Sequence, residues 1–399
     1  MKILRVTPSM NPAQGGPPQG IRASIDAMAG IEIENEVVCC DAPSAPWIGC
    51  DSFPVHALGP GKFGFSFTPR MIPWLIKNAQ RFDAVVLHGM WQWPGLALLR
   101  SAVPRYFLMP HGMLDPWFQR DASRRVKAVR NFIYWWLFER RVVNRAAGVL
   151  FTCEEEMRLA RTTFGGYRPR TEINVGYGIA PPPDFSEKMR SAFSEKLPDL
   201  KGRPYLLFLS RIHPKKGVDL LIQAYSDALS TEKLKASPPC LVIAGPGWET
   251  IYGKQMQQLI EASTAQLLPE NSKLRTVPSI LRVGMLEGDA KWGALYGCQA
   301  FILPSHQENF GIAVVEALAC NKPVLISTNV NIWREITDAN AGLIMSNDSE
   351  SIRKSILEFI NTLCSKEKVF FTQPLDCYKK YFQVTNFNDR LLHAFSSAS

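Results

Sequence analysis

The sequence predicts an α/β protein made of two doubly wound, parallel-sheet domains. Short apolar runs alternate with helix-like segments along the chain, which is the pattern of βα units. A run of three prolines at 181–183 separates two such series, and consecutive prolines cannot continue a helix or a central strand. The length of 399 residues fits two or three domains of ordinary size.

The first domain is placed at residues 1–180. It opens with an apolar run at 2–9, a Gly/Pro loop at 14–20 and a helix-like stretch at 21–29, an order that begins many doubly wound sheets. The other expected strands are Glu36–Cys40, Ala84–His88, Arg105–Met109 and Gly148–Thr152.

The second domain is placed at residues 181–378. Its expected strands are Tyr205–Leu209, Leu241–Ala244, Ser279–Val283, Ala300–Leu303 and Pro323–Ser327. The amphipathic tail, 379–399, is expected to form a helix that crosses back to the first domain. Ligands of doubly wound folds lie beyond the carboxyl ends of the strands, so chemistry is expected in the strand-to-helix loops, at a cleft that the two domains face.

Composition excludes several classes of protein. A hydrophobic content of 46% rules out a disordered chain. Neither a secretory signal nor a long apolar span is evident, so we expect a cytoplasmic protein. The nine cysteines show no zinc-ligand spacing, and we expect them to be reduced and mostly buried, with disulfides as the alternative.

The strongest chemical signal is the segment 301–319, in which a buried strand, a polar loop and an apolar helix opened by Gly311 follow one another. Free N–H groups at a helix start favour a phosphate. Glu308 lies in the loop, and Glu316 lies within the apolar helix. A carboxylate there needs hydrogen bonds, which ribose hydroxyls would provide; the alternative is a solvent-facing position.

Two further loops support a nucleotide site. Arg211 and Lys216 follow the strand Tyr205–Leu209, and a guanidinium with an ammonium suits a diphosphate, although a solvated turn is the alternative. The loop with Gly284, Met285 and Leu286 could hold a flat base through its backbone. The Gly245–Gly247 loop is interpreted as a plain tight turn.

With the two glutamates seven residues apart, the Glu-Asn-Phe-Gly turn and the upstream cations, these segments resemble retaining glycosyltransferases of the GT-B fold, family 4. The resemblance implies that Glu308 contacts the donor sugar, Glu316 the ribose, and Arg211 with Lys216 the diphosphate. It implies donor contacts at Asn309, Phe310, Gly311 and Ile312. It also implies no metal and no cofactor, the nucleotide sugar being the substrate.

In the first domain the resemblance directs attention to other strand-end loops. It implies that Gly15 and Gly16 face the donor phosphates and the acceptor, and that His111 contacts the donor sugar or the reaction centre. His88 and Asp115 could face the acceptor. For both histidines a structural role is the alternative.

The segment 120–145 carries eight basic and two acidic residues around the aromatic-rich run 133–138. This pattern suits an anionic membrane surface, and the alternative is a solvated helix whose aromatic residues are core. No nucleic-acid motif accompanies it, so nucleic acid is not an expected partner. The Trp-rich element that follows the segment 111–117 resembles bacterial exopolysaccharide glycosyltransferases, whose acceptors are often lipid-linked.

The sequence thus predicts a retaining, metal-independent glycosyltransferase that uses a nucleotide sugar, UDP-glucose above all. Its acceptor would be a glycan or a lipid-linked sugar of a bacterial extracellular or envelope polysaccharide, and the enzyme would be a monomer or weak oligomer. The alternatives are a nucleotide-sugar epimerase of the same fold and a non-catalytic, sugar-nucleotide-binding membrane scaffold.

Overall fold

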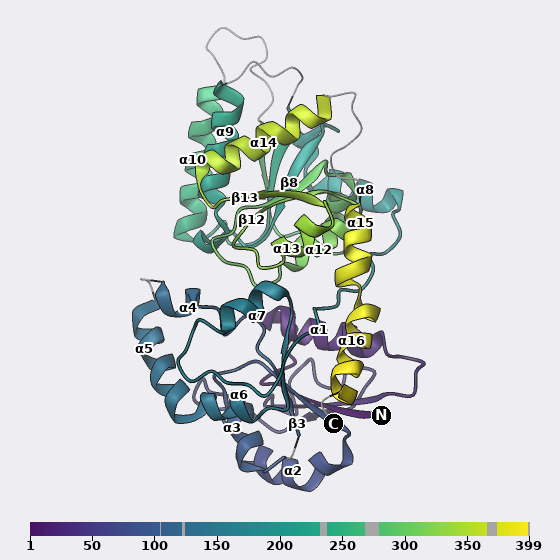
Figure 1. Cartoon of the computed structure of the whole chain (residues 1–399). Helices are drawn as coiled ribbons and strands as arrows, with labels where there is room; N and C mark the ends of the chain where they lie inside the picture. Colours follow the sequence, from purple (N-terminus) through teal and green to yellow (C-terminus); the bar gives the residue numbers. More distant parts are fainter. Residues whose placement is uncertain (104, 122–123, 232–237, 268–278, 365–372, 398–399) are drawn as a thin grey trace. The chain divides into compact units, whose positions relative to one another are not determined.

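The computed structural model describes residues 1–103, 105–121, 124–231, 238–267, 279–364 and 373–397 (Figure 1). The chain divides into two compact units, Met1–Ala180 with Tyr381–Ser399, and Pro181–Lys380. Each unit contains one parallel sheet with helices packed around it, so the predicted class of two Rossmann-like domains is confirmed.

The first unit contains a seven-stranded sheet in the order β3-β2-β1-β4-β5-β6-β7. Its central strands are buried along their whole length, because helices cover both faces of a parallel sheet. The strands are β1 (Lys2–Val6), β2 (Glu34–Cys39), β3 (Val55–Ala57), β4 (Ala84–His88), β5 (Phe107–Met109), β6 (Gly148–Phe151) and β7 (Glu172–Asn174).

Helices complete the first unit, and the first of them differs from the sequence prediction. The helix α1 begins at Gly16 rather than at residue 21, with Pro17 and Pro18 in its first turn, where the missing N–H group of proline removes no helical hydrogen bond. The helices are α1 (Gly16–Asp26), α2 (Met71–Asn78), α3 (Trp93–Arg100), α4 (Trp117–Arg120), α5 (Arg125–Tyr134), the π-helix η4 (Trp135–Glu139), α6 (Arg140–Arg145), α7 (Glu154–Ala160), α16 (Val384–Ser397) and the 3-10 turns η1 (Pro12–Gln14) and η2 (Ala79–Arg81).

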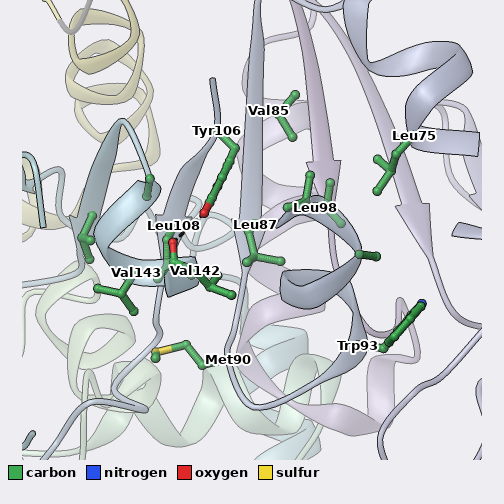
Figure 2. Packing of buried hydrophobic residues seen from close by; sticks show 14 of the residues in the cluster. Leu75, Val85, Leu87, Met90, Trp93, Leu98, Tyr106, Leu108, Val142 and Val143 are labelled. Carbon is green, nitrogen blue, oxygen red and sulfur yellow. Dashed lines mark hydrogen bonds between the residues drawn. The ribbon is translucent and has the colours of Figure 1, made fainter. Parts of the chain in front are cut away.

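A large apolar cluster joins the sheet of the first unit to its helices (Figure 2). Trp135 of η4 is fully buried in it, its ring stacks on Phe164 at 4.7 Å, and its Nε1 donates to the Gly165 carbonyl at 2.8 Å. These contacts fasten the segment 125–145 to the body of the unit.

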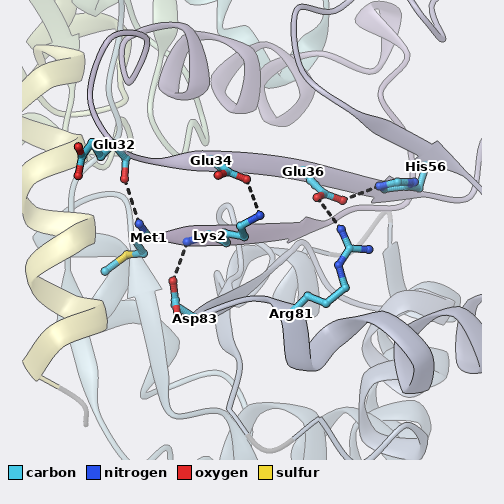
Figure 3. Close-up of polar contacts among 8 residues, drawn as sticks. All are labelled: Met1, Lys2, Glu32, Glu34, Glu36, His56, Arg81 and Asp83. Carbon is cyan, nitrogen blue, oxygen red and sulfur yellow. Dashed lines mark hydrogen bonds and ion pairs between the residues drawn. The ribbon is translucent and has the colours of Figure 1, made fainter.

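Charged side chains gather at and near the beginnings of β1, β2 and β4 in the first unit (Figure 3). Lys2 pairs with Glu34 at 2.7 Å, and its backbone N–H donates to Asp83 at 2.7 Å. Glu36 accepts from Arg81 at 3.1 Å and contacts His56 at 2.7 Å. The contacts of Lys2 with Glu34 and Asp83 lie at the edge of the sheet opposite the carboxyl ends of the strands. The candidate site residues lie at those carboxyl ends.

The C-terminal helix α16 belongs to the first unit. Asn388 donates to the Ser24 carbonyl of α1 at 3.0 Å and accepts from the Ser24 hydroxyl at 2.8 Å. A Cβ atom at Gly178 would lie 2.6 Å from the Cα of Val384, so only glycine permits this close approach.

The second unit contains a six-stranded sheet in the order β10-β9-β8-β11-β12-β13. Its strands are β8 (Tyr205–Leu209), β9 (Cys240–Ala244), β10 (Ile280–Val283), β11 (Ala300–Leu303), β12 (Val324–Ser327) and β13 (Gly342–Met345). Its helices are α8 (Glu187–Lys196), α9 (Val218–Thr231), α10 (Ile251–Leu267), α11 (Gly288–Gly297), α12 (Ile312–Ala319), α13 (Trp333–Asp338), α14 (Ser349–Cys364), α15 (Pro374–Cys377) and the 3-10 turns η5 (Pro198–Leu200) and η6 (Pro214–Lys216); the π-helix η7 (Tyr378–Phe382) spans the boundary between the units.

Among the described residues, no helix is long and apolar enough to cross a membrane. Eight cysteines are described, all of them as free thiols, and all but Cys50 are buried. The side chain of the ninth, Cys364, lies outside the described residues.

We expect Trp135→Ala to lower the free energy of unfolding of the first unit by about 3–5 kcal/mol, the usual cost of emptying a buried Trp site. Trp136→Ala is the matched control, because the adjacent ring is 41% exposed; it should cost about 1 kcal/mol or less. Differential scanning calorimetry measures both. Equal losses from the two variants would contradict the described packing.

Candidate functional site

Two strand-end loops of the second unit lie in direct contact. β8 and β11 are neighbours in the sheet, so the loops that follow them emerge side by side. The N–H of His306 donates to the Lys215 carbonyl at 2.9 Å. Gly217 has φ +66°, and a Cβ there would lie 2.2 Å from the Pro304 carbonyl oxygen. Glycine at this position therefore allows the loops to close on each other.

This loop contact brings Lys216 and Glu308 together, 92 residues apart in sequence. The Lys216 ammonium donates to Oε2 of Glu308, and only 9% of the lysine side chain is exposed. Burial, followed by the charges of Lys215 and Arg211, lowers the pKa of Lys216 to about 7. The Glu308 carboxylate acts in the opposite direction, because an adjacent negative charge stabilises the ammonium.

The Glu308 loop is held from its other side by the segment after β12. The N–H of Glu308 donates to the Asn329 carbonyl at 2.9 Å, and the N–H of Asn331 donates to the Glu308 carbonyl at 2.9 Å. Gly311 then adopts φ +77° as the N-cap of α12. Ile312 begins that helix, while Asn309 and Phe310 lie in the turn before it. The start of α12 is thus placed beside the Lys216–Glu308 pair.

Glu316 has a partner that the sequence did not indicate. Its Oε1 accepts from Lys291 of α11 at 2.8 Å, and its side chain is 14% exposed. Lys291 also lies 4.2 Å from the ring centroid of Trp292. The simple alternative of a solvent-facing carboxylate is therefore wrong for this structure. The second carboxylate oxygen leaves capacity for hydroxyl donors.

The other residues that the sequence analysis predicts for the donor lie in neighbouring loops. Arg211 is exposed at the end of β8. After β10, Met285 is 55% exposed, Leu286 is buried, and the Gly284 carbonyl accepts from the N–H of Gly245 at 3.1 Å.

Glycine in the Gly245–Gly247 loop has a further role that a plain tight turn does not need. At Gly245 a Cβ would lie 1.8 Å from the Ser210 carbonyl oxygen. The loop therefore packs directly on the backbone that leads to Arg211.

In the first unit, His88 and His111 form a contacting pair at the ends of β4 and β5. Nδ1 of His88 lies 3.0 Å from Nε2 of His111, and the rings are nearly parallel. Burial lowers the pKa of His111 to about 4. Burial, then His111 and Arg5, lower the pKa of His88. Both imidazoles are therefore neutral at pH 7, so one ring donates a hydrogen bond to the other.

Burial gives His88 a different setting from the predicted acceptor contact. Its ring is 3% exposed and lies against His111, which favours the structural alternative considered for it. Asp115 is also buried, and its Oδ1 accepts from the N–H of Trp117 at 2.8 Å. Gly15 is exposed with φ +92°, and the Gly16 carbonyl accepts from the Tyr177 hydroxyl at 2.6 Å.

A buried carboxylate that sequence analysis missed holds the His111 turn. Glu156 of α7 accepts from the N–H of Gly112 at 2.5 Å, from the N–H of Thr152 at 2.7 Å and from the Thr152 hydroxyl at 2.5 Å. His111 itself has φ +51°, a conformation that most side chains disfavour. Glu156 stands in the run Glu154-Glu155-Glu156, where nothing in the sequence distinguishes it from its neighbours.

The second-unit arrangement can bind an anion that carries hydroxyl groups. Lys216, Arg211 and the start of α12 supply positive potential, while Glu308 and Glu316 supply hydrogen-bond acceptors. Among the described residues, no cluster of three or more His, Cys, Asp or Glu side chains could hold a metal ion.

Two family models match the chain, one within each of its two compact units. Residues 15–175 match the family model "Glycosyl transferase 4-like domain", and residues 189–368 match "Glycosyl transferases group 1". The chain therefore has the GT-B α/β fold, and each of its two units matches a glycosyltransferase domain model.

Individual relatives are distant. The chain is 24% identical over 211 residues to a D-inositol 3-phosphate glycosyltransferase of Jonesia denitrificans, covering 52% of this chain and 47% of that protein. It is 28% identical over 161 residues to the O-antigen chain mannosyltransferase B of Escherichia coli. This match covers 40% of this chain and 37% of that protein. The chain thus spans about half or less of the length of these curated relatives.

Among solved structures, Anabaena HepE in complex with UDP and glucose superposes with a TM-score of 0.69 at 18% identity, over 100% of both chains. At this identity the likeness establishes the fold.

We expect Glu156→Gln to lower the melting temperature of the first unit by several degrees, because an amide offers one oxygen where three donors now point. Glu154→Gln is the matched control on the same helix, since Glu154 forms a surface pair with Arg158, and exposed pairs contribute little to stability. Thermal unfolding followed by circular dichroism measures both. Equal melting temperatures for the two variants would contradict the assigned role of Glu156.

Proposed function

We propose that the protein is a retaining glycosyltransferase that transfers a hexose from a nucleotide sugar to a glycan or lipid-linked acceptor. The observation that carries the proposal is the Lys216–Glu308 pair beside the glycine-initiated helix α12. Cation, acceptor carboxylate and helix start are the three groups that a sugar diphosphate needs, and they lie at adjacent strand ends of one sheet.

In this proposal the pair exchanges partners when the donor binds. The diphosphate takes the Lys216 ammonium, and its negative charges raise the pKa of this lysine, which keeps it protonated. The Glu308 carboxylate is then available to accept hydrogen bonds from sugar hydroxyls. An ion pair that is already in place presents both groups with little conformational change.

Catalysis would depend on the leaving diphosphate. Lys216, Arg211 and the N–H groups at the start of α12 stabilise the charge that develops there as the glycosidic bond breaks. These positive groups are the basis for proposing metal-independent catalysis. Transfer with retention follows the family-4 resemblance, with the leaving group assisting attack from the same face.

UDP-glucose is the proposed donor. HepE, which shares the fold, has been crystallised with UDP-glucose and with UDP and glucose. The exposed loop at Gly284 and Met285, next to buried Leu286, offers backbone groups and an apolar side chain for a flat base.

A bacterial extracellular or envelope polysaccharide is the proposed product. An O-antigen chain mannosyltransferase is among the relatives of the chain. The resemblance of the Trp-rich segment to exopolysaccharide enzymes supports the same class of acceptor.

We expect UDP-glucose to raise the melting temperature more than GDP-mannose or ADP-glucose at equal concentration, because only a bound ligand stabilises the folded state. Differential scanning fluorimetry over a concentration series measures the shifts, with free UDP as the reference. A larger shift of the melting temperature with a GDP- or ADP-sugar would contradict UDP-glucose as the donor and would favour that sugar instead. No shift with any of them would overturn the nucleotide-sugar site.

We expect Lys216→Ala and Glu308→Ala each to lower kcat/KM for transfer by at least about 100-fold, as loss of a transition-state charge contact typically does. Nucleotide release in the presence of cell-envelope acceptor measures the rate.

Lys254→Ala, an exposed lysine on α10, is the control and should leave the rate unchanged. A near-normal transfer rate in either site variant would show that the substituted residue is not part of the active site. NMR of the product distinguishes retention from inversion at the anomeric carbon, and inversion would overturn the retaining mechanism.

A further inference from the structure

The segment 125–141 of the first unit exposes apolar side chains along one side of its helices. Their spacing of three and four residues places them on a single face. This face is called the α5 stripe. It consists of Val126 (85% exposed), Val129 (61%), Phe132 (54%), Ile133 (54%), Trp136 (41%) and Leu137 (52%). The alternative, in which the aromatic residues of this segment are core, holds for Trp135 but not for Trp136, and Phe132 is exposed as well.

Cationic side chains border the α5 stripe. Arg125, Lys127, Arg130 and Arg141 are exposed beside it. The only acidic residue in the sequence from 124 to 145 is Glu139, and it is 1% exposed. The surface is thus both apolar and strongly positive, a combination that water alone solvates poorly and that an anionic interface satisfies.

The α5 stripe is presented by a rigid support. Within η4, Trp135 and Glu139 point into the unit, and Oε1 of Glu139 accepts from the N–H of Trp91 at 3.2 Å. The guanidinium of Arg140 lies 4.5 Å from the ring centroid of Trp136. A π-helix accommodates an extra residue, and π-bulges are frequent at functional sites. This segment keeps its inner residues in the core and its outer residues exposed.

We propose that the α5 stripe is a docking surface for an anionic lipid bilayer. The six apolar side chains would enter the interface between headgroups and acyl chains, and the arginines and lysine would contact lipid phosphates. Charge argues against a second copy of the chain as the occupant, because two equally positive faces repel each other. The inner face of the helix packs on the unit, so the helix lies in the plane of the membrane surface.

Co-sedimentation of the full-length protein with phosphatidylcholine vesicles containing about one-third phosphatidylglycerol tests the proposal. We expect binding at low salt, much weaker binding to pure phosphatidylcholine, and weaker binding as salt is raised. The triple variant Val126→Asp, Val129→Asp, Ile133→Asp should lose binding by at least about ten-fold. All three side chains are more than half exposed, so their replacement leaves the core intact.

Ile251→Asp provides the matched control, because Ile251 is 82% exposed on α10 of the second unit. It should bind vesicles like the unaltered protein. Binding that the triple variant retains would overturn the docking surface, as would no binding of the unaltered protein at low salt. Sedimentation velocity adds one further outcome: a dimer that only the triple variant abolishes would assign the stripe to a second copy. None of these measurements depends on glycosyl transfer. Their outcome therefore tests the docking surface independently of the proposed activity.

Discussion

The geometry of parallel sheets is the constraint on which the rest of this structure depends. All strands of a parallel sheet end at one edge, so residues far apart in sequence meet there whenever their strands are neighbours. In the second unit this places the loop after β8 against the loop after β11, and Lys216 reaches Glu308. In the first unit the same rule places His88 beside His111, at the ends of β4 and β5.

Glycines and buried carboxylates convert this proximity into defined loops. Gly217 and Gly245 permit backbone approaches that any Cβ atom would block. Glu156 and Glu308 each hold a turn beyond a strand end, the first by accepting from backbone N–H groups and the second by pairing with a buried cation. The difference matters for the proposed function, in which Lys216 exchanges Glu308 for a diphosphate, whereas the partners of Glu156 are part of the fold.

The first unit also shows how a single helical segment can serve the core and the surface together. Trp135 and Glu139 secure η4 inside the unit, while Phe132 and Trp136 are exposed on its outer side. The net charge is concentrated in the same segment. Residues 1–180 carry +7 of the total charge of +9, and residues 120–145 account for +6 of that. The positive balance of the protein is therefore a local feature of one surface.

Much of the fold followed from the sequence, since the strands Ala84–His88, Tyr205–Leu209 and Ala300–Leu303 were predicted to the residue. Buried apolar runs bounded by turn residues allow this. The short strands β3, β7 and β13 were missed, because three or four partly exposed residues carry no periodic pattern. The start of α1 was misplaced because two prolines indicate a loop unless they stand in a first helical turn.

For the site, the sequence by itself determined which residues end buried strands and therefore which chemistry could gather. Local context alone predicted the candidate residues: the cations Arg211 and Lys216, the glutamates Glu308 and Glu316, and the turn at Gly311. Only the tertiary structure decided the pairs: Lys216 with Glu308, Lys291 with Glu316, and Glu156 with the His111 turn. Partners 25 to 92 residues apart leave no local pattern, because the order of the strands in the sheet decides which loops become neighbours.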